Sequence, residues 1–188
     1  PVFVSTSGGV VTAGTNGLSE TITTISVSDA VTQLDTDQTF VFVGDAGGAI
    51  DVSGGGGNGF TLDDGQTILG FNSGTPISFG QVQPVNITGN LGTVGGSVTA
   101  NTVTATHTGG STAIIVTAGV GGNRISGFDI GTGANQLGLS ITATSAPVSV
   151  DNVTFSTSGS LTTAIRNLNS TQNVTFTNVD IDNGGAVQ

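Results

Sequence analysis

Apolar and small polar residues alternate along most of this chain. Aliphatic or Phe positions are separated by Thr, Ser or Asn in short runs, and Gly or Asn interrupts the runs. Residues 148–155 and 174–181 show the alternation clearly. A period of two is typical of strands with one buried face, and the three-to-four spacing of helices is nearly absent. The pattern therefore predicts many short β-strands.

The alternating segments also repeat at a longer distance. Three rows that begin at Ile125, Val150 and Phe176 match at three apolar positions. They follow one another at a step of about 25 residues, which is in the range of repeat architectures. The matched residues are Ile125, Phe128 and Ile130; Val150, Val153 and Phe155; and Phe176, Val179 and Ile181. A second apolar track advances at nearly the same step, through Ile115, Ile141, Ile165 and Val187.

This long period favours a parallel solenoid. In such a fold each coil stacks on the next through strand hydrogen bonds, so equivalent positions share size and polarity. A β-sandwich, which is the alternative, places turns about every 8 to 12 residues without the longer register. We predict an all-β parallel β-helix with coils of about 25 residues. Residues 1–188 would form one domain, with an N-terminal cap region at 1–36 and coils at 37–188.

Two asparagines fall at equivalent places in the repeat. Asn152 and Asn178 are one repeat apart, each directly before a matched valine. Asn tolerates the left-handed backbone of a sharp bend, and stacked Asn side chains bond from coil to coil. We interpret the pair as a structural ladder. The rival interpretation is sugar attachment, because N-x-S/T sequons occur at Asn86, Asn152, Asn169 and Asn173.

The first third of the chain departs from the repeat. Residues 28–34 predict a short helix with Ser28 as N-cap, Asp29 in the first turn and an apolar face of Ala30, Val31 and Leu34. Beyond it, the sequence predicts further elements: a buried strand at 39–43, a glycine-rich loop at 47–59 and two strands around an Asp-Gly turn at 60–71.

The order of segments at 2–4, 24–34, 40–44 and 59–70 resembles the opening of pectate-lyase-like right-handed β-helix proteins. Residues 123–130 and 173–181 resemble the repeating coils of that superfamily. The resemblance implies that the β-helix is right-handed and that the short helix caps the N-terminal end. Its members include polysaccharide lyases and hydrolases, phage tailspikes and bacterial surface adhesins, so the fold alone leaves activity open. No matching C-terminal cap is visible, and we expect one segment of a longer protein.

The composition limits the classes of partner that the chain can bind. Charged residues make up 7% of the chain, and 12 acidic residues against 2 basic ones give a formal charge of -10. Such a surface repels phosphate backbones and anionic lipid, so neither nucleic acid nor membrane insertion is expected. The lack of cysteine excludes disulfides, thiolate metal sites and Cys nucleophiles.

Candidate catalytic residues are few. A lyase of this fold would need a base, and the only candidates are Arg124 and Arg166, each one place from a core-track residue and so expected to point outward. A glycosidase would need converging carboxylates, and Asp129 and Asp180 match across rows with Thr154 between them. Two strand spacings would separate these carboxylates by roughly 9 to 10 Å, a distance marginally compatible with an inverting pair. Asp151 and Asp182 lie in the same coil region.

No cofactor is expected, and calcium is the ligand that the chain would suit best. Asp45, Asp51, Asp63 and Asp64 lie near the glycine-rich loop, but that loop lacks the Asp of the calcium-binding nonapeptide. His107 is the only histidine and is expected at a solvent-facing turn. We name no catalytic, cofactor-binding or metal-ligating residue.

The sequence therefore predicts a non-enzymatic structural or adhesive segment of an extracellular or cell-surface bacterial protein. Its partners would be further copies of itself, stacked end to end into filaments, or components of a host or cell surface. The alternative is a polysaccharide lyase, hydrolase or tailspike that acts on carbohydrate.

Overall fold

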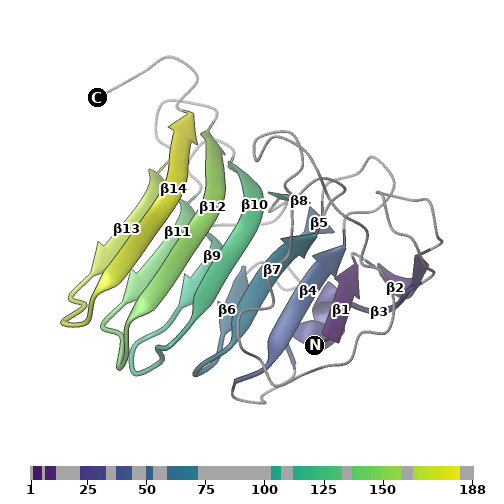
Figure 1. Ribbon diagram of the computed structural model, residues 1–188, viewed down its shortest axis with the longest axis horizontal. Helices are drawn as coiled ribbons and strands as arrows, with labels where there is room; N and C mark the ends of the chain where they lie inside the picture. Colours follow the sequence, from purple (N-terminus) through teal and green to yellow (C-terminus); the bar gives the residue numbers. More distant parts are fainter. Residues whose placement is uncertain are drawn as a thin grey trace.

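A computed structural model describes the chain at residues 2–5, 7–11, 22–32, 37–43, 50–52, 59–71, 103–106, 112–132, 137–157 and 163–182. Within these ranges it forms strands joined by turns and one short helix (Figure 1). The strands are β1 (Val2–Ser5), β2 (Ser7–Val11), β3 (Ile22–Ser26), β4 (Thr39–Val43), β5 (Ile50–Asp51), β6 (Phe60–Leu62), β7 (Thr67–Phe71), β8 (Val103–Thr106), β9 (Thr112–Val116), β10 (Arg124–Thr132), β11 (Leu137–Thr142), β12 (Val148–Thr157), β13 (Thr163–Leu168) and β14 (Val174–Asp182), and the helix is α1 (Val27–Ala30).

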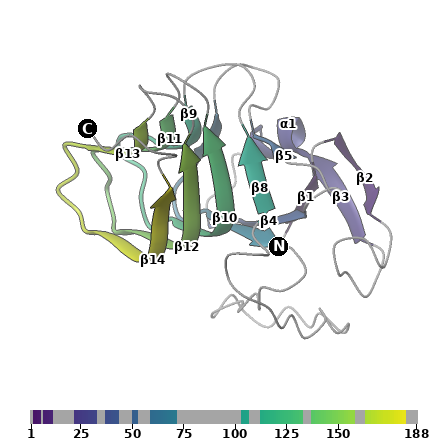
Figure 2. The same cartoon turned by 90° about the horizontal axis from the view of Figure 1, so that it is seen from above.

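The described strands build two sheets that face each other across the core. The larger sheet runs β14-β12-β10-β7-β4-β1-β3-β2, with β8 pairing β10 and β5 pairing β8. The smaller sheet runs β13-β11-β9-β6. Every pairing among these strands is parallel except that of β2 with β3. The chain thus winds into a β-solenoid of about 3 turns, which confirms the predicted all-β parallel β-helix (Figures 1 and 2).

The first apolar track has the register that the sequence predicts. Ile125 pairs with Val150, and Val150 pairs with Phe176. The two columns that follow also pair row by row, and they comprise Phe128, Val153 and Val179, then Ile130, Phe155 and Ile181. In the two inner rows, on β10 and β12, these side chains are at most 1% exposed. Stacking of like side chains therefore fills this side of the core.

The second track is wrong at Ile115 and at Ile165. Ile141 pairs with Val116 rather than with Ile115, and with Asn167 rather than with Ile165. One buried column of this sheet runs through Ile114 and Leu139 and continues to Ile165 in the last coil, and Val116 and Ile141 form a second. Residues 114–116 are all apolar, so alternation alone does not fix which of them points inward. Val187 lies outside the described residues.

A left-handed bend interrupts each long strand of the larger sheet. Gly127, Asn152 and Asn178 occupy equivalent positions and have φ angles of 79°, 54° and 51°. Asn178 Nδ2 donates a hydrogen bond of 2.8 Å to Asn152 Oδ1. The predicted asparagine ladder is therefore confirmed. A Cβ at Gly127 would lie 2.8 Å from the Gly70 carbonyl oxygen, which explains why glycine takes this place in the first rung.

A second left-handed position recurs where β11 and β13 end. Ala143, the residue after β11, has φ 42°, and Asn169, the residue after β13, has φ 55°. The Ala143 amide donates a hydrogen bond of 2.9 Å to the carbonyl of Leu168, the residue before Asn169. An alanine in this region carries a steric cost of roughly 1 to 2 kcal/mol that glycine avoids.

Ala143→Gly is expected to raise the free energy of unfolding by about 0.5 to 1 kcal/mol, since relief of the strain exceeds the added flexibility of the unfolded chain. Urea titration followed by circular dichroism measures the change. The matched control is Ala118→Gly in an exposed turn, at a residue without a positive φ, which should not gain stability. Equal changes in the two variants would contradict a strained Ala143.

The helix begins earlier than the sequence analysis predicts. Ser26, not Ser28, is the N-cap: the Asp29 amide donates to Ser26 Oγ at 3.0 Å, and Ser26 Oγ donates to Asp29 Oδ2 at 2.7 Å. This reciprocal contact resembles a capping box. Val27 and Ala30 are 1% exposed and close the N-terminal end of the core, while Leu34 lies outside the described residues. The described chain contains no helix long and apolar enough to cross a membrane.

The other N-terminal predictions are largely confirmed. Strand β4 occupies 39–43, and β6 and β7 flank a turn at 63–66, although these two strands belong to different sheets. The predicted loop at 47–59 is partly wrong, because Ile50 and Asp51 form β5, which pairs with β8. Ile50 and Val52 are 0% and 1% exposed, so this short segment contributes to the core. The division into a cap region and coils stays a prediction.

Candidate functional site

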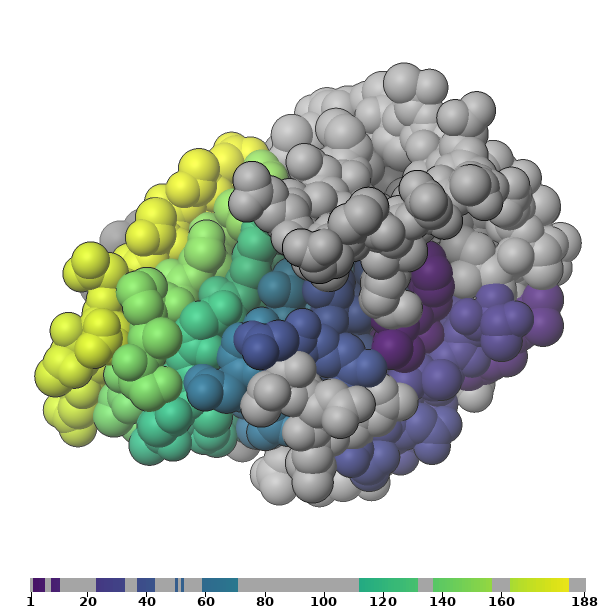
Figure 3. Space-filling view, turned by 60° about the horizontal axis from the view of Figure 1, so that its bottom comes forward, coloured from purple at the N-terminus to yellow at the C-terminus, as the bar shows by residue number. Residues whose placement is uncertain are grey.

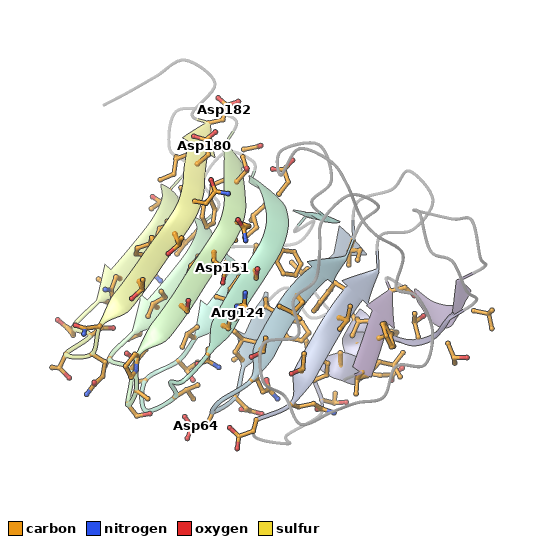
Figure 4. The ribbon with its side chains drawn as sticks, in the orientation of Figure 1. Asp64, Arg124, Asp151, Asp180 and Asp182 are labelled. Carbon is orange, nitrogen blue, oxygen red and sulfur yellow. The ribbon has the colours of Figure 1, made fainter. Side chains whose placement is uncertain are left out.

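A charged cluster spans two neighbouring coils on the outer face of the larger sheet. Arg124 on β10 makes two contacts with Asp151 on β12: Nε to Oδ1 at 2.8 Å and Nη2 to Oδ2 at 3.0 Å. Asp151 Oδ2 also accepts from Ser126 Oγ at 2.6 Å and from Asn152 Nδ2 at 3.1 Å. Figure 4 shows the labelled Arg124 and Asp151 on these adjacent strands. The repeat places them together because Ser126 pairs with Asp151.

The cluster holds both groups in their charged forms. Burial disfavours the charged carboxylate, but hydrogen bonds from Arg124, Ser126 and Asn152 together with the Arg124 charge outweigh it, so the pKa of Asp151 lies below its usual value. The hydrogen bond to Asp151 raises the pKa of Arg124. An arginine bound to a carboxylate in this way is a poor proton acceptor. The chemistry of the cluster suits the joining of coils better than proton transfer.

The second arginine lies elsewhere. Arg166 is on β13 of the smaller sheet, where it is exposed and donates from Nη2 to Ser140 Oγ at 3.1 Å. Both arginines point outward, as predicted, but from different sheets. The structure therefore does not bring them to one site.

The two matched carboxylates have the predicted register. Asp129 pairs with Thr154, and Thr154 pairs with Asp180, so one strand separates them. Asp129 Oδ1 accepts a hydrogen bond of 2.8 Å from Ser156 Oγ, and Asp180 is exposed near the end of β14 (Figure 4). These carboxylates share an outward-facing column of the sheet.

Two of the acidic residues near the glycine-rich loop, Asp63 and Asp64, lie in a turn. Asp64 Oδ1 accepts from the Gly121 amide at 2.9 Å, and the Asp63 carbonyl accepts from Asn123 Nδ2 at 2.7 Å. These contacts join the turn between β6 and β7 to the next coil. Within the described ranges no group of three or more His, Cys, Asp or Glu residues could hold a metal ion. Asp45, His107 and the side chain of Asp51 lie outside the described part.

The last described coil presents a different kind of surface. Its strands β13 and β14 are the outermost described members of the two sheets at this end of the solenoid (Figures 1 and 2). Phe176 and Ile181 are 43% and 51% exposed, although their partners Val150 and Phe155 in the previous coil are 0% exposed. Leu168 on β13 is 43% exposed. We call β13 and β14 the open terminal coil.

Sequence reasoning noted Arg124 and Asp151 separately but missed their pairing. The signal was present, because the predicted row register already places Ser126 beside Asp151 and Arg124 two residues before Ser126 on the same face. A diagonal pair of opposite charges on one face is within reach of an arginine side chain. No protein-family model, curated protein or solved structure matches this chain.

Proposed function

We propose that the chain is a non-enzymatic structural or adhesive segment of an extracellular or cell-surface bacterial protein, and that it assembles through its open terminal coil. One observation carries the proposal: the inward columns continue to β14, where Phe176 and Ile181 meet solvent. An edge strand with exposed apolar side chains is a template for pairing with another strand.

The energetics favour a partner at this end. Complete burial of a Phe or Ile side chain contributes about 1.5 to 3 kcal/mol relative to full exposure, and each of these two is already about half covered. Pairing of the outer edge of β14 would also satisfy backbone groups along a strand of 9 residues. Burial of these two side chains and pairing of these backbone groups both favour the addition of further strands at this end of the solenoid.

The rest of the solenoid suits a rigid spacer. Neighbouring coils contact each other through in-register strands. The Arg124–Asp151 pair adds to the contact between β10 and β12, and the asparagine ladder adds to the contact between β12 and β14. Such stacking produces a stiff rod whose outer turns tolerate variation. The resemblance to pectate-lyase-like β-helices supports the same proposal, since that superfamily includes surface adhesins.

A second candidate is a carbohydrate-degrading β-helix. The register of Asp129, Thr154 and Asp180 favours it, because carboxylates two strands apart lie roughly 9 to 10 Å from each other. An inverting glycosidase uses about this separation. A lyase of this fold would need a base instead, and the candidate on this sheet, Arg124, is bound to Asp151, so the structural role remains our proposal.

Negative-stain electron microscopy across a series of chain concentrations, with and without calcium, tests the proposed function. Filaments or ordered oligomers that lengthen with concentration are expected. Discrete short particles at every concentration would contradict assembly, and cleavage of anionic polysaccharides by the same preparation would establish the carbohydrate-active alternative. A dependence on calcium would identify a bound ion as part of the contact.

A further inference from the structure

The large exposed apolar side chains of the described residues lie at the two ends of the solenoid. Among the residues that the structure describes, four large hydrophobic side chains are exposed: Val10, Leu168, Phe176 and Ile181. The last three belong to the open terminal coil, and Val10 lies on β2. In Figures 1 and 2 these elements occupy opposite ends, and Figure 3 shows the yellow terminal coil and the purple N-terminal strands on opposite sides.

The two ends are also the two outer edges of one sheet. The described strands of the larger sheet begin with β14 and finish with β2. Strand β2 runs antiparallel to β3, whereas the strands from β3 to β14 run parallel. If one copy follows another in the same orientation, β2 of the second meets β14 of the first as an antiparallel neighbour, which is a favourable pairing.

The charges favour this arrangement over contact between two terminal coils. Asp180 and Asp182 lie at the end of β14, so joining two copies by this coil would bring four carboxylates to one interface. Strands β1, β2 and β3 contain no charged residue. An uncharged edge repels the acidic β14 edge less than a second copy of that acidic edge would.

We infer that the partner of the open terminal coil is a second copy of this chain, which docks the β2 edge around Val10 against the β14 edge around Phe176. The inference rests on the proposed function and names its partner. The contact joins different surfaces of identical chains and leaves an unpaired edge at each end. Such a heterologous contact does not close, and it produces a filament with one polarity.

Two edge variants and their mixture test the contact. Val10→Asp places a charge on the β2 edge, and Phe176→Asp places one on the β14 edge. Each variant alone is expected to raise the concentration needed for assembly by about tenfold or more, because a carboxylate would be desolvated in the contact. An equimolar mixture retains one intact edge of each kind, so sedimentation velocity should detect a species of two chains and nothing longer.

Thr61→Asp is the matched control, because it adds the same charge at an exposed position of β6 away from both edges. It should assemble like the unmodified chain. If Phe176→Asp loses the circular dichroism signal of the folded chain, Ile181→Asp at a 51% exposed position replaces it with the same expected result.

The outcomes separate the two proposals. If the unmodified chain assembles and Val10→Asp assembles equally well, the contact with β2 is wrong while the structural function stands. A mixture that stays monomeric would likewise overturn the inference. If the unmodified chain never assembles, both fail.

Discussion

Replacing Phe42 by alanine is expected to lower the free energy of unfolding by about 3 to 5 kcal/mol. The Phe42 side chain is 0% exposed, and its ring meets Phe60 and Phe128 edge to face with centroids 5.2 and 5.5 Å away. Phe42 and Phe128 come from the larger sheet, whereas Phe60 comes from the smaller one. The truncation therefore opens a cavity where the two sheets meet, and close packing leaves little means of filling it.

The control is the same substitution in the open terminal coil. Phe176 is 43% exposed, so Phe176→Ala should cost less than about half as much as the substitution at Phe42. Urea unfolding followed by circular dichroism, at a concentration where the chain is monomeric, measures both. Similar losses of unfolding free energy at the two positions would mean that Phe176 is packed as well as the core residues. That result would contradict the description of β13 and β14 as an open terminal coil.

The predictable part of this fold is the part in which alternation is unambiguous. The rows at Ile125, Val150 and Phe176 keep polar or small residues between their apolar ones, so only one register buries all of them. Asn152 and Asn178 were also predictable, because few residues other than Gly tolerate a left-handed bend and the spacing matches the coil length.

The errors occur where neighbouring residues offer equivalent choices. Residues 114–116 are three apolar residues in succession, and the pairing with Leu139 rather than alternation decides that Ile114 points inward. Ser26 and Ser28 are both suitable N-caps. The structure selects Ser26 because this start buries Val27 and Ala30 and places Asp29 at the third position of the helix. Tertiary packing thus settles what local propensity leaves open.

The candidate surfaces follow from the repeat more than from any motif. Phe176 has the register of the buried Val150 and is exposed because it lies in the last described row, and no local feature of residues 174–182 distinguishes this row from the buried ones. Val10 could not be assigned from sequence, because β2 lies outside the repeat and pairs antiparallel with β3. Edge positions are properties of the assembled sheet, and a pattern of alternation does not reveal them.

Asp151→Asn is expected to lower the free energy of unfolding at neutral pH by about 1 to 2 kcal/mol, since it removes a charged partner of Arg124 and weakens the bonds from Ser126 and Asn152. The value is at the lower end of the range for charged pairs because the Arg124 side chain is 37% exposed and solvent screens it. Asp129→Asn is the control, where the carboxylate accepts from Ser156 alone among the described contacts. It should cost less.

The pH dependence of the difference identifies the carboxylate. The hydrogen bonds and the Arg124 charge set the folded pKa of Asp151 below its unfolded value, which is about 3.9. The contribution to stability is therefore complete above that unfolded value and is lost as the pH falls through it toward the lower folded pKa. Urea titrations of the unmodified chain and of Asp151→Asn should differ most at neutral pH and converge below about pH 4. A difference in unfolding free energy that stays constant down to acid pH would show that the shape of Asp151, and not its charge, is stabilising. The Arg124–Asp151 pair would then contribute no electrostatic link between the coils.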